Sequence, residues 1–185
     1  MIKLENVTVK YNDKTVISNL TFEFKDGFNA ILGKSGSGKT TLANAILSLK
    51  EYEGRITSDH TKYAAVFQED RLIENLSVKK NLSLFCKDNT LIEEGLNALL
   101  LSDSANKKAL ELSGGMKRRV ALLRALLSDY EVLILDEPFK GLDKATKNIT
   151  MNYIKEKTSG KIVILITHDL SEVEFFNCNS LFIKL

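Results

Sequence analysis

The sequence predicts an α/β protein with a mainly parallel core sheet, an N-terminal antiparallel β-subdomain and a short α-helical subdomain insert. Near-alternating apolar residues over positions 2–24 indicate antiparallel strands. From Phe28 an apolar strand is followed by a glycine loop and a helix, which is the unit that builds parallel sheets. The runs EVLILD and KIVILI are continuously apolar, as is typical of strands buried on both faces.

The antiparallel part has two opening strands, over residues 2–9 and 20–24, with a turn between them at Asn12, Asp13 and Lys14. Two more short strands are expected around residues 54–57 and 62–67. The alternation in all of these segments is short, which favours strands over helices.

The helical part is expected between the strands of the core. Residues 78–110 carry Leu and Ile at helical spacing, so they predict a helical insert, and a further helix begins near Ser113. A helix over roughly residues 144–157 separates EVLILD from KIVILI. We therefore expect one domain over residues 1–185, with its helical subdomain at roughly residues 70–127.

Composition excludes several classes of protein. The chain has 185 residues, of which 44% are apolar and 27% charged, and its net charge of +2 gives no basic field that would indicate nucleic acid. The longest apolar runs are far shorter than the roughly 18 residues of a membrane span, and Lys3 and Glu5 do not suit a signal peptide. We therefore expect a cytoplasmic chain. Cys86 and Cys178 lie far apart, so we expect two reduced thiols. The sequence ends 17 residues after His168, so no carboxyl-terminal regulatory domain is expected.

The first chemical motif is GKSGSGKT at residues 33–40, a phosphate loop between a predicted strand and a predicted helix. Its glycines allow backbone N–H groups to surround a phosphate at the positive end of a helix, and Lys39 adds a charge worth about 4 kcal/mol per unit phosphate charge at ~4 Å. A glycine-rich turn that fits by chance is the alternative interpretation. The predicted nucleotide-binding residues are Gly33, Lys34, Ser35, Gly36, Ser37, Gly38, Lys39, Thr40 and Thr41, and Thr40 is also a predicted Mg²⁺ ligand.

The second motif is VLILDEP at residues 132–138, in which a buried strand carries two acids at its carboxyl end. In parallel sheets this edge binds ligands. We expect Asp136 to hold the Mg²⁺ shell, and Glu137 to act as general base or orienter for the water that attacks the γ-phosphate. A solvated acid pair is the alternative.

The third motif is LSGGM at residues 112–116, which opens a helix. Ser113, Gly114 and Gly115 form a second helix N-terminus with little side chain in the way, and this start suits a γ-phosphate. An ordinary serine N-cap is the alternative when the motif is taken alone.

Together, these motifs resemble those of the ABC (ATP-binding cassette) ATPases. The phosphate loop, LSGG, LILDEP, GLD at residues 141–143 and a lone His168 occur in that family's order and rough spacing, over essentially the whole chain. The resemblance implies a P-loop NTPase fold, ATP and Mg²⁺ as cofactors, and ATP hydrolysis. It also implies a head-to-tail dimer with a second copy of the chain, in which LSGG of one copy faces the phosphate loop of the other.

Further site residues are carried over by the resemblance. Gln68 corresponds to the glutamine that approaches Mg²⁺ or the attacking water, and His168 to the histidine that contacts the γ-phosphate. Tyr11 suits the aromatic residue that stacks on adenine, although a strand-end tyrosine commonly only packs. Asp143 corresponds to the acid that links the two sites across the dimer, whereas Met116 departs from the family's usual glutamine.

The stretch FQEDRLIENLSVKKNL at residues 67–82 resembles the ATPases of bacterial importers, most nearly the nitrate, sulfonate and taurine group. Leu72, Ile73, Leu76 and Val78 are either part of a groove for a coupling helix or simply core. The first interpretation implies integral membrane permease subunits as partners, with a substrate-binding protein for import, and a peripheral location at the cytoplasmic face of the cell membrane.

Two other classes of function are weighed against a transporter subunit. A soluble ABC ATPase acting on ribosomes or DNA is the main alternative, although the chain has one cassette and no basic patch. A module that binds nucleotide without hydrolysis is disfavoured because Glu137, Gln68 and His168 are all present.

Overall fold

The computed structural model describes residues 1–11 and 14–183, and the chain divides into two compact units. The first, here called the sheet unit, comprises Met1–Tyr63, Glu131–Asp136 and Gly160–Leu185. The second, the helical unit, comprises Ala64–Tyr130 and Glu137–Ser159. Asn12 and Asp13, where a turn is predicted, lie outside the described residues.

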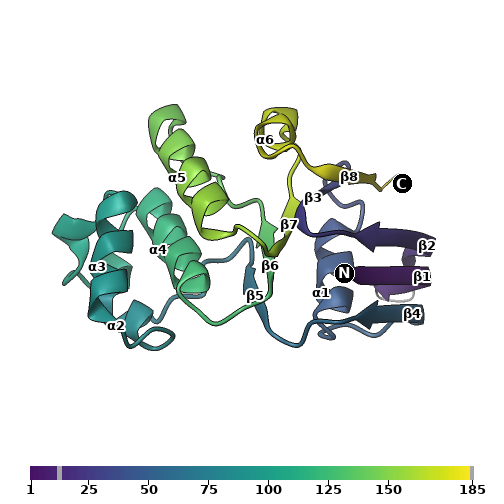
Figure 1. Ribbon diagram of the computed structural model, residues 1–185, viewed down its shortest axis with the longest axis horizontal. Helices are drawn as coiled ribbons and strands as arrows, with labels where there is room; N and C mark the ends of the chain where they lie inside the picture. The colour runs from purple at the N-terminus through teal and green to yellow at the C-terminus, as the bar shows by residue number, and fades with distance from the viewer. Residues whose placement is uncertain (12–13, 184–185) are drawn as a thin grey trace. The chain divides into compact units, whose positions relative to one another are not determined.

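The sheet unit contains an antiparallel sheet of β1 (Ile2–Tyr11), β2 (Lys14–Phe24) and β4 (Glu53–Ser58). β1 carries the amino terminus and lies between the other two strands (Figure 1). The buried positions of β1 step from Leu4 to Val7 instead of alternating strictly, and the register shifts at the same place. Asn6, with φ of 50°, has the left-handed conformation that inserts the extra residue. The predicted antiparallel β-subdomain is therefore confirmed, with a bulge that keeps the apolar side chains on one face.

The sheet unit also contains parallel strands in the order β6-β7-β3-β8. These are β3 (Gly27–Leu32), β6 (Val132–Asp136), β7 (Ile162–Ile166) and β8 (Asn179–Phe182). All residues of β6 and β7 are buried, as their apolar runs predict. The helices of this unit are α1 (Lys39–Ile46) and α6 (Leu170–Phe176), and α6 packs on β3 by stacking Phe176 on Phe28, with ring centroids 4.2 Å apart.

The helical unit contains α2 (Val78–Ser83), α3 (Asn89–Ala98), α4 (Gly114–Leu126) and α5 (Lys144–Lys157). The short strand β5 (Tyr63–Val66) begins at the last residue of the sheet unit's first segment and continues into this unit. Apolar residues from α2, α3 and α4 form one core cluster around Leu82, Ile92 and Leu123. The predicted helix over 144–157 is confirmed as α5, which Asp143 caps.

The helical insert is less regular than the spacing of Leu and Ile predicts. α3 ends before Leu100, whose φ of 56° is left-handed. The chain then continues as two short 3₁₀ turns, η1 (Ser102–Ser104) and η2 (Ala109–Glu111), before α4. Apolar spacing thus indicates which residues face the core, but short helical turns of both kinds produce similar spacing.

Both cysteines are free thiols, as expected. Cys86 is buried in the core cluster of the helical unit. Burial, with a contribution from the charge of Glu172, raises the pKa of the Cys178 thiol to about 12, so Cys178 is a poor nucleophile. Within residues 1–11 and 14–183, every helix is too short or too polar to cross a membrane.

Candidate functional site

Three neighbouring parallel strands deliver predicted site residues to the same edge of the sheet unit. In the register of the sheet, Ile166 of β7 lies between Ile31 of β3 and Asp136 of β6. The phosphate loop follows β3 directly, Asp136 ends β6, and His168 comes two residues after β7. The carboxyl ends of parallel strands meet at one edge, so the topology collects these groups where α/β proteins bind ligands.

The turn of the phosphate loop leads into α1 at Gly38, the N-cap of this helix, whose φ of 93° is left-handed. A side chain at this position would also approach Ile17 Cδ1 and the Val16 carbonyl oxygen to 3.2 Å, so glycine is required. No side chain caps α1, which leaves the first N–H groups of the helix to other acceptors. The loop therefore presents a helix N-terminus of the kind that binds anions.

Lys39 and Ser37 add polar groups to this loop. The largely buried Lys39 ammonium donates to the carbonyl oxygens of Gly33 at 2.8 Å and Lys34 at 2.9 Å. An ammonium has three donors, so a phosphate oxygen can accept the third. The Ser37 hydroxyl is buried and makes no hydrogen bond to any residue that the structure describes. An uncompensated buried hydroxyl is costly, and it suits a loop that receives a polar ligand.

Thr40 and Asp136 form the polar contact expected of a magnesium site. The Thr40 hydroxyl donates to Asp136 Oδ2 at 2.6 Å, and the Asp136 side chain is almost wholly buried. Hydroxyl and carboxylate oxygens are ligands that Mg²⁺ prefers, and the ion is commonly held by one or two protein groups together with substrate phosphates. The residues present therefore fit a magnesium-nucleotide complex.

Tyr11 and His168 also belong to the sheet unit, and both are exposed. Tyr11 is 57% exposed, and the Lys50 ammonium lies 5.7 Å from the centroid of its ring. An exposed ring that accepts a cation on its face is not a packed core residue, so the simple packing interpretation of Tyr11 is disfavoured.

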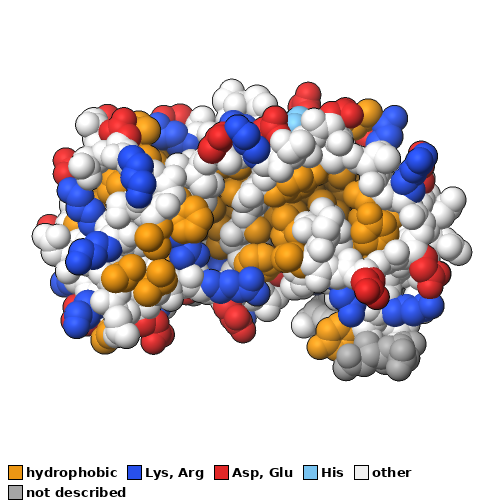
Figure 2. Space-filling view, turned by 90° about the horizontal axis from the view of Figure 1, so that it is seen from below, with side chains coloured by type: hydrophobic (Ala, Val, Ile, Leu, Met, Phe, Trp, Pro, Cys, Tyr) orange, Lys and Arg blue, Asp and Glu red, His pale blue; other side chains and the backbone are white. Residues whose placement is uncertain are grey.

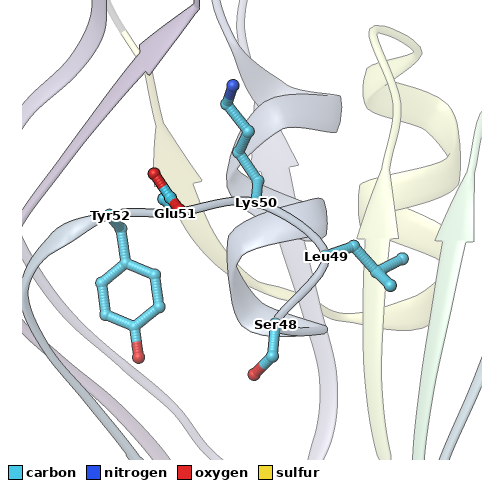
Figure 3. Close-up of a pocket in the computed structure, with 5 residues that line it drawn as sticks. All are labelled: Ser48, Leu49, Lys50, Glu51 and Tyr52. Carbon is cyan, nitrogen blue, oxygen red and sulfur yellow. The ribbon is translucent and has the colours of Figure 1, made fainter.

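Lys50 belongs to a separate hollow, of about 380 Å³, formed by the five residues Ser48–Tyr52 after α1. Figure 3 shows their side chains pointing in different directions. The polar groups do not converge, so this hollow has no feature of a second ligand site.

In the helical unit, a hollow of about 580 Å³ brings together residues that the sequence places far apart. It is lined by Gln68, by the turn Ser113, Gly114 and Gly115, and by Asp143. Four further charged side chains border it, namely Asp70, Arg118, Arg119 and Lys140. Five predicted site residues therefore share one surface of one unit.

The Ser113 turn has the geometry of a helix start open to solvent. Ser113 is the N-cap of α4, and its hydroxyl accepts from Met116 N–H at 3.3 Å, so the capping interpretation is correct. Capping by Ser113 does not explain the glycine at position 115, where a side chain would come within 3.3 Å of the Gly141 carbonyl oxygen. Glycine there lets the LSGG turn pack closely against the GLD segment that carries Asp143.

Asp143 is the N-cap of α5 and accepts from the N–H groups of Ala145 and Thr146, both at 3.0 Å. Hydrogen bonds from the Thr146 side chain and backbone lower the pKa of the Asp143 carboxyl below its ordinary value of 3.8. The carboxylate is therefore ionised at neutral pH on the rim of the hollow, and its charge acts on Arg119, which lines the same hollow.

Asp143→Asn is expected to remove the part of the free energy of unfolding that depends on the ionised Asp143 carboxylate. The helix cap is kept, because asparagine caps helices equally well. A lowered folded pKa stabilises the folded state above the unfolded value, and this stabilisation disappears as pH falls through the folded value. The free energy of unfolding of the wild type should therefore exceed that of the variant at neutral pH and converge with it well below pH 3.8. Urea unfolding at stepped pH measures the difference, and a gap that stays constant with pH would contradict it.

Comparison with known proteins decides the family. Residues 17–140 match the family described as ABC transporter. This chain belongs to that family. The prediction of an ABC-type ATPase, made from the phosphate loop, LSGG and LILDEP, is confirmed, and so is the α/β fold class.

Several curated ABC proteins are similar to this cassette. The aliphatic sulfonates import ATP-binding protein SsuB of Bacillus cereus is 33% identical over 198 residues, which cover 95% of this chain and 78% of that protein. The manganese transport system ATP-binding protein MntB of Halalkalibacterium halodurans is 32% identical, with 94% and 79% covered. The Nod factor export ATP-binding protein I of Burkholderia orbicola is also 32% identical, and the cassette spans only 64% of its length.

Solved structures of ABC cassettes have the same fold. The dimeric bacterial ABC transporter cassette MJ0796 is 30% identical and superposes with a TM-score of 0.87, covering 98% of this chain and 94% of that one. A post-hydrolysis dimer of MJ0796 bound to ADP and Pi has a TM-score of 0.88 at 29% identity.

The structure also shows site residues that sequence reasoning missed. Arg118 is buried, although it is charged and borders the hollow of the cassette's helical unit. A signal was present: positions 118, 121, 122 and 125 share one face of α4, and the other three are apolar and buried. An arginine on an apolar face needs specific partners, which Arg118 finds in the segments next to Gln68 and Glu137.

Three of the four apolar residues singled out after Gln68 divide between the core and the groove interpretations. Val78 is wholly buried in the core cluster, and Leu72 packs against that cluster. Ile73 is 48% exposed. The groove interpretation is therefore wrong for Val78 and remains open for Ile73.

Proposed function

We propose that this chain is the ATP-hydrolysing subunit of an ABC transporter, and that two copies close head to tail on two ATP molecules. One observation carries the proposal: the chain has two helix starts open to anions, one at the phosphate loop of the sheet unit and one at the Ser113 turn of the helical unit. A single nucleotide site uses one phosphate loop, so a second anion-receiving turn is explained if it serves the nucleotide of a partner copy.

The residues of the sheet unit hold the nucleotide in this proposal. Lys39 and the first N–H groups of α1 bind its phosphates, and Tyr11 stacks on the base. Thr40 and Asp136 hold Mg²⁺, with Gln68 as a further ligand or water-orienting group. When bound, the ion neutralises charge on the phosphates.

Three polar side chains carry out the hydrolysis in this proposal. Glu137 accepts the proton of the attacking water, Gln68 orients that water, and His168 donates a hydrogen bond to the γ-phosphate. Ser113 and Gly115 of the partner copy then contact the same phosphate. Hydrolysis removes the group that joins the two copies, so the dimer reopens.

A membrane partner is supported by the surface of the helical unit. Figure 2 shows hydrophobic side chains on this unit, at the left of the view, next to Lys and Arg side chains. Ile73, Leu84 and Phe85 are each about half exposed, at 48%, 50% and 54%. Leu84 and Phe85 directly follow α2, and the Asn81 side chain of α2 is hydrogen-bonded to the Ile73 backbone, so the three residues belong to one region of this unit. Exposed apolar side chains that gather in one region are typical of a protein–protein contact. The name of the sulfonate relative supports import, and that of the manganese relative supports a transport system. The proposal accordingly has permease subunits and a substrate-binding protein as partners, with the chain at the cytoplasmic face of the membrane.

Co-purification tests the proposal against its main alternative. The tagged chain is expressed in its native host, and solubilised membranes and pelleted ribosomes are both probed for it. We expect recovery with an integral membrane protein and ATP turnover by the purified chain. Recovery with ribosomes or DNA, and none with membranes, would replace the transporter assignment by a soluble ABC ATPase.

A further inference from the structure

Arg118 is a buried charge in the helical unit. It lies on α4, five residues after Ser113, and its side chain is only 5% exposed. Arginine keeps its positive charge at physiological pH, and removing that charge from water is costly unless several hydrogen bonds replace the lost hydration. The partners of Arg118 therefore indicate why the residue is there.

Two of these partners belong to the segment around Gln68. Nη1 of Arg118 donates to the carbonyl oxygen of Phe67, the residue immediately before Gln68. The same nitrogen lies 3.2 Å from Asp70 Oδ1. The guanidinium thus binds the backbone just before Gln68, at Phe67, and a carboxylate just after it, at Asp70.

Two other partners belong to the segment that carries Glu137. Nη2 donates to the Glu137 carbonyl oxygen at 2.8 Å, and Nε donates to the Pro138 carbonyl oxygen at 3.2 Å. One planar guanidinium therefore joins the two backbone segments that present Gln68 and Glu137, which lie 69 positions apart along the chain. A guanidinium fork fixes direction as well as distance, which an ammonium does not.

The backbone of Glu137 needs such support. Its φ of 47° is left-handed, which is uncommon for a non-glycine residue. It also precedes Pro138, and a proline disfavours helical conformations in the residue before it. A conformation of this kind persists only where neighbouring groups hold it, and the hydrogen bonds of Arg118 fall on the two carbonyls of this turn.

A second arginine of α4 fixes the Gln68 segment further along. Arg124 donates to the carbonyl oxygens of Arg71 at 2.8 Å and Asp70 at 3.1 Å. The Arg71 guanidinium in turn lies 3.8 Å from the centroid of the Phe67 ring. The segment is therefore attached to α4 at two places, whereas the Glu137 turn is attached through Arg118.

From this geometry we infer that Arg118 is a positioning residue, which sets the backbones of Gln68 and Glu137 relative to each other and to the helix that starts at Ser113. The inference rests on the proposed function, in which Gln68 and Glu137 act on the same water. In this role Arg118 acts through the two residues whose backbones it holds. A misplacement of about 1 Å can lower a rate roughly 10²-fold.

Arg118→Lys tests this role because it keeps a positive charge but loses the planar fork. We expect kcat for ATP to fall about 10-fold or more, while KM and the affinity for a fluorescent ATP analogue stay within about twofold. Thr158→Val is the matched control: Thr158 is a buried polar residue of the same unit whose hydroxyl donates only locally, to the Ile154 carbonyl oxygen at 2.8 Å. This control should melt at a lower temperature and keep its kcat.

A double-mutant comparison separates positioning from stability. In a Glu137→Gln background, Arg118→Lys should lower the residual rate by a clearly smaller factor than in the wild type, because one of the two residues it positions is already disabled. Asp70→Asn, which changes a half-buried partner of Arg118, should fold normally and lower kcat about two- to fivefold. If Arg118→Lys does not fold, the kcat of Asp70→Asn tests the positioning role instead.

The outcomes are distinct. A wild-type chain without ATP turnover would remove the proposed function itself. A wild-type chain that turns over ATP, with Arg118→Lys or Asp70→Asn leaving kcat unchanged, would remove the positioning role alone. An equal loss of rate in the wild-type and Glu137→Gln backgrounds would also overturn it.

Discussion

Glu137→Gln is expected to slow ATP hydrolysis by roughly 10²-fold or more, which corresponds to about 3 kcal/mol of barrier. Glutamine has nearly the same size as glutamate but does not accept a proton from the attacking water. Phosphate release at saturating ATP measures the rate. Nucleotide affinity should be unchanged, because Lys39 and Thr40 are intact, and a closed dimer should accumulate with ATP.

Glu131→Gln is the matched control, since it makes the same substitution just before the amino end of the strand that ends in Asp136. Its carboxylate accepts the N–H groups of Thr61 and Lys62, at 2.9 and 3.1 Å, and these bonds lower the pKa of Glu131. The control should affect stability and leave turnover near the wild-type value. Normal turnover in Glu137→Gln would remove Glu137 from the reaction.

Ser113→Arg is expected to abolish ATP-dependent dimerisation and to leave ATP binding by a single chain intact. The Ser113 turn is exposed and lined by glycines, so a long side chain there fills the space proposed for the partner's triphosphate. The phosphate loop of the same chain belongs to the sheet unit and is unaltered. Sizing chromatography with ATP, in the Glu137→Gln background where the dimer persists, measures the effect.

Ser77→Arg supplies a control with the same local geometry. Ser77 caps α2 with φ −64° and ψ 161°, the values found at Ser113, and its hydroxyl likewise accepts an N–H three residues on. Both variants lose a helix cap worth about 0.5–2 kcal/mol. Only the Ser113 variant should lose the dimer, and a dimer that survives Ser113→Arg would show that the LSGG turn does not meet a partner's nucleotide.

Local sequence signals predicted the elements that need no distant partner. The α5 helix begins after Asp143 and ends at Lys157, as its cap and spacing indicate. The phosphate loop could be predicted because its chemistry lies within eight consecutive residues. The insert over 78–110 was predicted less well, since apolar spacing alone does not distinguish α3 from the η1 and η2 turns.

The family resemblance identified Gln68, Ser113 and Asp143 as candidate residues, but their meeting in one hollow is a property of the folded helical unit. The same is true of Val78, which periodicity left open between a groove and the core and which packing assigns to the core.

The sequence by itself thus determined the fold class, the phosphate loop, the acids that end β6 and the capped start of α4, because each depends on residues close together in the chain. Only the tertiary structure decided that Arg118 is buried and which carbonyls it holds. Its partner Phe67 is 51 positions away, and burial and hydrogen bonding depend on what the folded chain brings near a residue, whatever its neighbours in sequence are.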